Sequence, residues 1–256
     1  MENIKFNLKG MTAIITGAGN GIGKGAALLL AENGVNVVCG DLHKETADET
    51  AREAEKYGVK AVGVECDVTK EADLEKLVEI CKEKMGGVNI LVNNAGGGGG
   101  GREFFDKLTL SYIEKIYRLN VFSIFKLSQL CAPYMNEAKY GSIINISSMA
   151  GQMASNNMSV YGSSKAAINQ LTKYMAMDLG PYIRVNAIAP GAIKTDALKS
   201  VLTDEIEKKM LVNTPLKVLG ETEDIANMIL FFASPLSKWT SGQVIAINGG
   251  GVQSLD

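Results

Sequence analysis

The sequence predicts an α/β fold in which seven parallel strands form a single doubly wound sheet with helices on both faces. Short apolar runs rich in β-branched residues alternate strictly with longer amphipathic segments, which is typical of this fold class. A glycine-rich turn directly follows the first apolar run. Neither an internal repeat nor a low-complexity linker divides the 256 residues, and a chain of this length can bury one large core. We therefore expect one domain spanning residues 1–256.

The expected strands are nearly continuous apolar runs, the pattern of a parallel sheet whose two faces are both covered. In order along the chain they are Thr12–Thr16, Val35–Cys39, Ala61–Glu65, Val88–Val92, Ser142–Ile146, Ile183–Ala187 and Gln243–Ile247. The clearest helical segments between them are Gly23–Asn33, Lys44–Tyr57 and Glu71–Met85. Right-handed crossovers would bring the loops at the strand C-termini around one crevice, where sheets of this kind bind their ligands.

The composition excludes several classes of protein. The 28 acidic and 26 basic residues give a formal charge of −2 without a basic stripe, so a nucleic-acid partner is not expected. The first twenty residues lack the basic start and apolar run of a signal peptide, and no segment approaches the ~18 apolar residues of a membrane span. The four cysteines form no C-x-x-C pair, and the one histidine cannot build a His-rich metal site. We expect a cytoplasmic protein with no bound metal and no membrane partner.

The glycine-rich turn Thr16–Gly23 reads TGAGNGIG and lies between the first strand and a helical pattern. This is the strand–turn–helix context in which dinucleotides bind, because glycines let the backbone approach a pyrophosphate and the helix N-terminus offers free N–H groups. A glycine turn with a purely structural role is the alternative. The cofactor candidates in the turn are Gly17, Asn20, Gly21, Ile22 and Gly23.

Polar side chains also follow the next three strands. Asp41 closes the second strand, where a carboxylate can accept hydrogen bonds from the adenosine ribose hydroxyls and would repel a 2′-phosphate. Since no arginine stands beside it, NAD(H) is favoured over NADP(H); the alternative is an acidic residue that only solvates a strand end. Asp67 and Val68 end the third strand, in position to meet the adenine edge. The fourth strand ends in further cofactor candidates, which are Asn94, Ala95 and Gly96.

The richest chemical pattern is the run Tyr161–Lys165, which reads YGSSK. A separation of four residues on a helix puts the phenol and the ammonium on one face. An unperturbed tyrosine pKa of roughly 10 is too high for acid–base work at neutral pH, and a nearby cation lowers that pKa because it favours the phenolate. Such pairs also occur by chance. Ser148, just after an expected strand, places a hydroxyl where it can donate to a substrate oxygen.

Together these residues carry a family resemblance: the chain resembles the short-chain dehydrogenase/reductase family over essentially its whole length. The matching motifs are TGAGNGIG at Thr16–Gly23, NNAG at Asn93–Gly96, Ser148, YGSSK at Tyr161–Lys165 and Pro190-Gly191. The resemblance implies a Rossmann-type fold and an enzyme that transfers hydride between a nicotinamide and a carbonyl/alcohol pair. A non-catalytic nucleotide sensor on the same fold is the alternative of another class, and the full set of catalytic residues speaks against it.

The resemblance also implies roles for individual residues. Tyr161 would be the general acid/base, Ser148 would orient the substrate oxygen, and Lys165 would lower the tyrosine pKa while binding the nicotinamide ribose. Asn120 matches a fourth catalytic position, which holds a proton-relay water near the lysine, and Ser147 is the neighbouring alternative to Ser148. The remaining cofactor candidates are Pro190, Gly191, Ile193 and Thr195. A homotetramer is implied as well.

Within that family the chain is most similar to bacterial 7α-hydroxysteroid dehydrogenases, which act on bile acids. The similarity rests on the glycine run Gly96–Gly101, the segment Leu119–Pro133, the loop Ala189–Thr203 and the C-terminal GGGVQSLD. It implies a bile-acid substrate and a lid at about 195–214 whose apolar face would meet the steroid; a surface helix packed on the core is the alternative for that segment. Other enzymes on this scaffold remain alternatives: a 12α- or 3α-hydroxysteroid dehydrogenase, or a 3-oxoacyl-carrier-protein reductase. The substrate-binding candidates are Gly98, Ser148, Asn157 and Tyr161.

Overall fold

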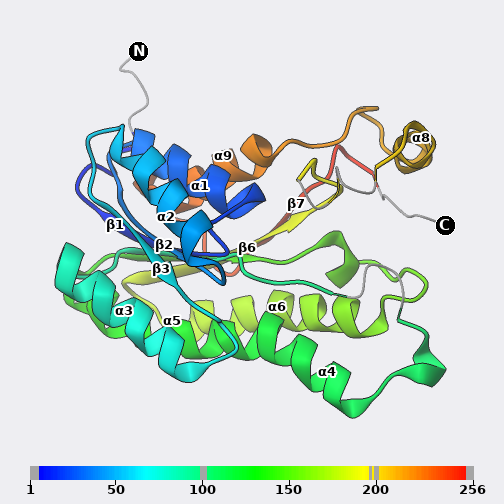
Figure 1. Cartoon of the computed structure of the whole chain (residues 1–256), viewed down its shortest axis with the longest axis horizontal. Coiled ribbons are helices and arrows are strands. Elements are labelled where there is room, and N and C mark those ends of the chain that lie inside the picture. The colour runs from blue at the N-terminus through cyan, green and yellow to red at the C-terminus, as the bar shows by residue number, and fades with distance from the viewer. Residues whose placement is uncertain (1–5, 99–102, 196–197, 199–201, 252–256) are drawn as a thin grey trace.

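The strands form one parallel sheet, as the sequence predicts. The computed structural model describes residues 6–98, 103–195, 198 and 202–251, and within these residues the sheet has seven strands in the order β3-β2-β1-β4-β5-β6-β7 (Figure 1). They are β1 (Thr12–Thr16), β2 (Asn36–Asp41), β3 (Ala61–Glu65), β4 (Ile90–Asn93), β5 (Gly141–Ile146), β6 (Ile183–Pro190) and β7 (Val244–Ile247). Every neighbouring pair is parallel. The predicted fold class and strand number are confirmed.

Several strand boundaries differ from the expected ones. The second strand extends past Cys39 to Asp41, because residues 40 and 41 still pair with the end of β3. Backbone pairing needs no apolar side chain, so an apolar run marks the middle of a strand better than its end. Asp41 is the last residue of β2, in agreement with its expected place at the end of that strand.

Side chains of the sheet alternate between two hydrophobic cores, one on each face. In β1, Ala13 and Ile15 lie in one core, whereas Ile14 lies in the other. Helices α1 (Gly21–Glu32), α2 (Lys44–Glu55) and α9 (Thr222–Ala233) cover the first face, and α3 (Glu71–Met85), α5 (Ser123–Glu137) and α6 (Ser159–Asp178) cover the second (Figure 1). The remaining elements are η1 (Phe105–Lys107), α4 (Leu110–Tyr117), η2 (Arg118–Phe122), η3 (Met149–Gly151), α8 (Asp204–Val212) and η4 (Pro235–Ser237). Among the helices of the described ranges, none is long and apolar enough to cross a membrane.

The chain changes direction across the sheet at β1, which pairs with β2 on one side and with β4 on the other. Such a switch point opens a crevice at the strand ends, because the loops after the two strands leave in opposite directions. Asn94 joins these loops: its side-chain Nδ2 donates to the carbonyl oxygens of Thr16 at 2.9 Å and of Gly17 at 3.1 Å. Its backbone N also donates to Thr16 Oγ1 at 3.1 Å. The fold thus fixes the mouth of the expected cofactor site.

The segment expected to form a lid, 195–214, contains helix α8, while 196–197 and 199–201 lie outside the described residues. Thr203 caps α8, since its side-chain oxygen accepts a hydrogen bond from the N–H of Ile206 at 3.3 Å. Lys194 lies 3.6 Å from a carboxylate oxygen of Glu207 on α8 and links the helix to the loop after β6. Figure 1 shows α8 at the edge of the molecule, away from the sheet.

Candidate active site

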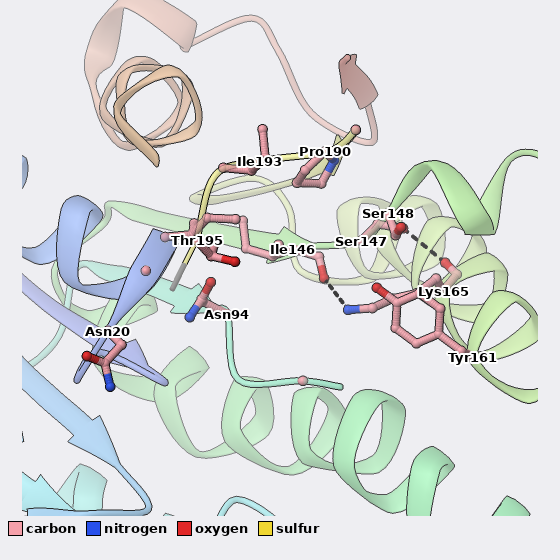
Figure 2. Close-up of a pocket in the computed structure, with 14 residues that line it drawn as sticks. Asn20, Asn94, Ile146, Ser147, Ser148, Tyr161, Lys165, Pro190, Ile193 and Thr195 are labelled. Carbon is pink, nitrogen blue, oxygen red and sulfur yellow. Dashed lines mark hydrogen bonds between the residues drawn. The ribbon is translucent and has the colours of Figure 1, made fainter. Parts of the chain in front are cut away.

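Most of the expected site residues line one cavity of about 480 Å³ at the C-terminal ends of the strands (Figure 2). The lining residues that the sequence predicts are Asn20, Gly21, Ile22, Asn94, Gly96, Ser148, Tyr161, Lys165, Pro190, Gly191, Ile193 and Thr195. The cavity is also lined by Ile146, at the end of β5, and by Ser147. Residues far apart in the sequence therefore meet at one place.

A second cavity, of about 250 Å³, lies toward β2 and β3. It shares Asn94 and Gly96 with the first cavity. The cofactor candidates that line it are Gly17, Asp41, Asp67, Val68, Asn94, Ala95 and Gly96. Because they share lining residues, the two cavities extend along the strand ends from β3 to β6. Sheets of this kind bind dinucleotides in the crevice at these strand ends.

The glycine-rich turn has the backbone that a dinucleotide site requires. Gly17 and Gly21 have φ of +63° and +55°, in the left-handed region that favours glycine. A Cβ on Gly23 would lie 2.0 Å from the carbonyl oxygen of Gly17, so only glycine lets the turn fold against α1. Asn20 is the N-cap of that helix, with an extended backbone. Gly23 therefore shapes the turn from behind, whereas Asn20, Gly21 and Ile22 face the cavity.

The carboxylate of Asp41 is held at the end of β2 by main-chain donors. Oδ2 accepts a hydrogen bond from the N–H of Gly19 at 2.8 Å, and Oδ1 accepts one from the N–H of His43 at 3.1 Å. The hydroxyl of Thr46 lies 3.3 Å from Oδ1. A carboxylate offers about four lone pairs, so the group can accept further bonds from a ligand. Its position on the second cavity fits the predicted contact with ribose hydroxyls.

Asp67 is engaged in its own turn. Its Oδ1 accepts hydrogen bonds from the N–H of Thr69 at 3.0 Å and from the Thr69 hydroxyl at 2.7 Å, while Lys70 Nζ lies 3.3 Å from Oδ2. Burial raises the pKa of this carboxyl, but the Thr69 hydrogen bonds and the Lys70 ammonium outweigh burial, so the pKa is lowered. Contact between this side chain and an adenine stays a prediction.

Tyr161 and Lys165 both lie on α6 and line the first cavity, as their spacing predicts (Figure 2). Lys165 Nζ lies 5.7 Å from the centre of the Tyr161 ring and donates to the carbonyl oxygen of Ile146 at 2.8 Å. The lysine is 4% exposed, and burial lowers its pKa to about 8. A Cβ on Gly96 would lie 3.2 Å from Nζ, so the loop after β4 also approaches the ammonium closely.

Lys165 is not among the groups that shift the pKa of Tyr161 in this structure, so its expected lowering of that pKa stays a prediction. The pKa of the phenol is raised: burial is the largest influence and outweighs the Ser148 hydroxyl, which lowers the pKa, and the charge of Glu103 raises it further. The lysine ammonium donates to the Ile146 carbonyl instead (Figure 2). A raised pKa favours the protonated phenol, which is the form that can donate a proton.

Asn120 lies on the π-helical turn η2 between α4 and α5, a kind of turn that is common at functional sites. Its buried side chain accepts a hydrogen bond from the N–H of Gly97 and donates to the Gly97 carbonyl, each at 2.9 Å. It also donates to Ser164 Oγ on α6 at 2.9 Å. These bonds fix the loop after β4 to α6. Asn120 lies behind the residues that line the two cavities, and the relay role implied by the resemblance stays a prediction.

The two serines after β5 have different partners. The buried hydroxyl of Ser147 donates to the carbonyl oxygen of Lys165 at 3.1 Å. Ser148 is the N-cap of η3, where its Oγ accepts from the N–H of Ala150 at 3.2 Å, and its hydroxyl interacts with the phenol of Tyr161. This arrangement favours Ser148 over Ser147 as the residue that meets a substrate oxygen.

The two further substrate candidates lie outside the lining of the first cavity. Gly98 packs against the ring of Tyr161, where a Cβ would lie 2.3 Å from Cδ2. Asn157 is exposed and has a left-handed backbone with φ +55°, and its carbonyl accepts from the N–H of Glu103 at 2.9 Å. Residues 99–101 of the glycine run lie outside the described residues. Substrate contact by Gly98 and Asn157 stays a prediction.

Five residues of the site were not predicted. Ile146, Leu42 and Cys66 line the cavities at or next to strand ends, so a search of every strand end would have found them. Leu119 lines the second cavity from the η2 turn, which an apolar helical pattern does not reveal. Glu103 accepts hydrogen bonds from the first turn of α6, and no motif marks it in the sequence.

Known proteins resemble this chain along nearly all of its length. A family model described as enoyl-(acyl carrier protein) reductase matches residues 17–251. The 7α-hydroxysteroid dehydrogenase of Escherichia coli (strain K12) is 50% identical over 252 residues, which are 98% of this chain and 98% of that one. The 3-oxoacyl-(acyl-carrier-protein) reductase of Thermotoga maritima is 37% identical over 250 residues, which are 96% of this chain and 99% of that one.

The same relationship holds in three dimensions. A 7α-hydroxysteroid dehydrogenase solved in complex with NADH and 7-oxo glycochenodeoxycholic acid matches this structure with a TM-score of 0.94 at 49% identity, covering 98% of both chains. Identity at this level across whole chains means common descent as well as a common fold. The chain belongs to the short-chain dehydrogenase/reductase family of oxidoreductases.

Proposed function

We propose that this enzyme uses NAD(H) to interconvert the 7α-hydroxyl and 7-oxo groups of bile acids. The observation that carries the proposal is the meeting of Ser148, Tyr161 and Lys165 in one cavity of a chain 50% identical to a 7α-hydroxysteroid dehydrogenase. The similar structure that holds NADH and a 7-oxo bile acid supports it. The 3-oxoacyl-(acyl-carrier-protein) reductase is less similar, at 37% identity, which supports the hydroxysteroid assignment over that alternative.

The residues at the strand ends fit NAD(H). The N-terminus of α1 offers N–H groups to a pyrophosphate, and Gly17 and Gly21 let the backbone come close. Asp41 would accept hydrogen bonds from ribose hydroxyls at the second cavity and repel the 2′-phosphate of NADP(H). The loop after β6 lines the first cavity beside Tyr161 and would hold the nicotinamide end through Pro190, Gly191, Ile193 and Thr195. When bound, the nicotinamide accepts or supplies the hydride.

Tyr161 is the general acid/base of this proposal. In reduction its phenol donates a proton to the oxygen of the former carbonyl, and the Ser148 hydroxyl donates a hydrogen bond to the same oxygen. In oxidation the phenol must first lose its own proton, which its raised pKa makes harder at neutral pH. Lys165 would hold the nicotinamide ribose, and Asn120 would place a relay water near the lysine.

The lid and the substrate candidates belong to the same proposal. We take the chain as one domain, in which residues at about 195–214 close over the steroid and α8 turns an apolar side toward it. The link from Lys194 to Glu207 ties α8 to the loop that would hold the nicotinamide, which supports a coupled closure. Gly98 and Asn157 lie on the segments that flank Tyr161 and would border the steroid from the other side.

We also propose that the enzyme works in the cytoplasm as a homotetramer. The four cysteines are buried free thiols, which suits a reducing compartment. Helices α5 and α6 expose apolar side chains, including Tyr174 at 58% and Met177 at 79%, beside a groove of about 390 Å³. Contiguous exposed apolar surface of this kind favours burial against another copy. Light scattering after size exclusion should give four times the 27.3 kDa chain mass, and a monomer would reject the assembly.

The proposed activity is tested by NADH formation at 340 nm with four bile acids, each offered NAD⁺ and NADP⁺. Turnover of cholate and chenodeoxycholate, but not of deoxycholate or ursodeoxycholate, would support a 7α-hydroxyl specificity, because deoxycholate lacks that group and ursodeoxycholate inverts it. Turnover of cholate and deoxycholate alone would move the assignment to the 12α-hydroxyl. Turnover of none of the four would reject the bile-acid substrate, and faster reaction with NADP⁺ would reject the cofactor preference.

A further inference from the structure

Glu103 is a buried carboxylate that the proposed chemistry does not use. The residue is 3% exposed and lies two residues before η1. Its Oε2 accepts hydrogen bonds from the backbone N–H of Val160 at 2.8 Å and from that of Tyr161 at 3.1 Å. Its Oε1 accepts from the hydroxyl of Tyr112 on α4 at 2.9 Å. A carboxylate in such a buried place is tolerated because these donors satisfy its charge.

The helical turn that Glu103 caps is the one that carries the phenol. Helix α6 begins at Ser159, so Val160 and Tyr161 belong to its first turn, whose N–H groups have no partner within the helix. The N-cap residue is Met158, which has no side-chain oxygen to offer. A carboxylate from 57 residues earlier takes that place and also complements the helix dipole.

We propose that Glu103 is a positioning residue for Tyr161. Its carboxylate fixes the backbone N–H of Tyr161 and thereby holds the phenol toward the substrate. The inference rests on the proposed role of Tyr161 as acid/base. A second bond supports it: the backbone N of Glu103 donates to the carbonyl of Asn157 at 2.9 Å, so the segment that leads into α6 is fixed as well. On the ring itself, Gly98 leaves no free space at Cδ2. Backbone and ring are thus both held.

The charge of Glu103 has a measurable effect on the Tyr161 phenol that a neutral capping residue would not have. The charged groups near the phenol, among the described residues, are Lys165 on α6, 5.7 Å from the ring centre, and Glu103, which also accepts a hydrogen bond from the hydroxyl of Tyr112 on α4. The charge of Glu103 raises the pKa of Tyr161. Removing that charge should therefore lower the pKa of the phenol, in addition to loosening the turn.

The decisive variant is Glu103→Gln, assayed for bile-acid oxidation across pH. The amide oxygen of glutamine can still accept from the two N–H groups, but it lacks the charge that strengthens both bonds. The turn should therefore be held less firmly, and kcat should fall about ten- to a hundredfold, as misplacement of a reacting group does. The KM for NAD⁺ should stay within about twofold, because the glycine turn is untouched. The rising limb of the pH profile should move to lower pH. Asp106→Asn makes the same charge change at an exposed residue of η1 and should alter none of these values.

A second variant and a second measurement keep the test decisive. Glu103→Asp retains the charge on a shorter side chain, so kcat should fall while the rising limb of the pH profile stays in place. A wild-type kcat in this variant would overturn the proposal. A limb that does not move in Glu103→Gln would also overturn it, because Glu103 would then be only a structural cap. If the wild-type enzyme turned over no bile acid, the proposed function would fail. The role of Glu103 could still be tested by NMR titration of ¹³C-labelled Tyr161, with its signal assigned from Tyr161→Phe. This titration compares the pKa of the phenol in wild type and in Glu103→Gln.

Discussion

Gly98 lies against the ring of Tyr161 so closely that a Cβ at this glycine would be 2.3 Å from Cδ2 and 2.6 Å from Cγ. These distances are far below van der Waals contact, so a methyl group here must displace either the ring or the loop. We expect Gly98→Ala to lower kcat by about tenfold or more, because an acid/base group moved by an ångström loses much of its effect. Binding of NADH, followed by its fluorescence, should change little.

Gly97→Ala is the matched control for this prediction. A Cβ on Gly97 would lie 3.7 Å from Leu119 Cδ2, which is ordinary contact. The loss of kcat in Gly97→Ala should therefore be much smaller than in Gly98→Ala. Equal losses of kcat in the two variants would mean that the loop tolerates alanine at neither position. The contact between Gly98 and the tyrosine ring would then not explain the loss of kcat.

Removal of the Tyr161 hydroxyl should abolish most of the activity. Tyr161→Phe keeps the ring and its packing but takes away the proton donor, so kcat should fall at least a hundredfold, the usual range for general acid–base catalysis. Affinity for NADH should be largely kept. Tyr174→Phe removes a hydroxyl from an exposed tyrosine of the same helix and serves as the control. Turnover near wild type in Tyr161→Phe would show that another group moves the proton.

Asp41 should decide which nicotinamide cofactor the enzyme prefers. Asp41→Asn removes the charge that would repel a 2′-phosphate, so we expect kcat/KM with NAD⁺ to fall and the ratio of NADP⁺ to NAD⁺ efficiency to rise about tenfold or more. Glu65→Gln is the control, because Glu65 pairs with Asp41 in the sheet and carries the same charge at an exposed position. An unchanged cofactor ratio in Asp41→Asn would exclude this carboxylate as the source of the preference.

The sheet and the cofactor end could be predicted because they depend on local patterns. Continuous apolar runs follow from burial of both faces of the sheet, and the strand-end rule then places Asp41 and Asn94 at one edge. The four-residue spacing likewise brought Tyr161 and Lys165 together. These inferences need only the spacing of residues within an element and the rule that parallel strands end at one edge of the sheet.

The rest depended on contacts between distant elements. The direction of the Lys165 ammonium is set by the Ile146 carbonyl at the end of β5, and helical spacing says nothing about that acceptor. The spacing therefore predicts that the two residues share a face of the helix, but not which acceptor the ammonium takes. Glu103 could not be predicted for the same reason, since the N–H groups that it binds lie 57 and 58 residues further along the chain.

Burial of Lys165 should make stability depend on pH in a defined direction. Its pKa is about 8 in the folded protein and 10.5 in its ordinary state, so the unfolded chain binds this proton more tightly. Below pH 8 the lysine is protonated in both states, and the folded state carries the full cost of burying the charge, about 3 kcal/mol. As the pH rises from 8 toward 10.5 the buried lysine becomes neutral, and this cost disappears.

Lys165→Met should therefore be inactive but more stable than wild type at pH 7, with an advantage that shrinks as the pH rises above 8. The gain has an upper limit of about 3 kcal/mol, because methionine leaves the Ile146 carbonyl without its donor. Urea unfolding between pH 7 and pH 9.5 measures the difference. Lys173→Met, at an exposed lysine of α6, should show no such trend. A difference that is constant across pH would mean that the charge of Lys165 is not what destabilises the fold, and that any gain comes from apolar packing alone.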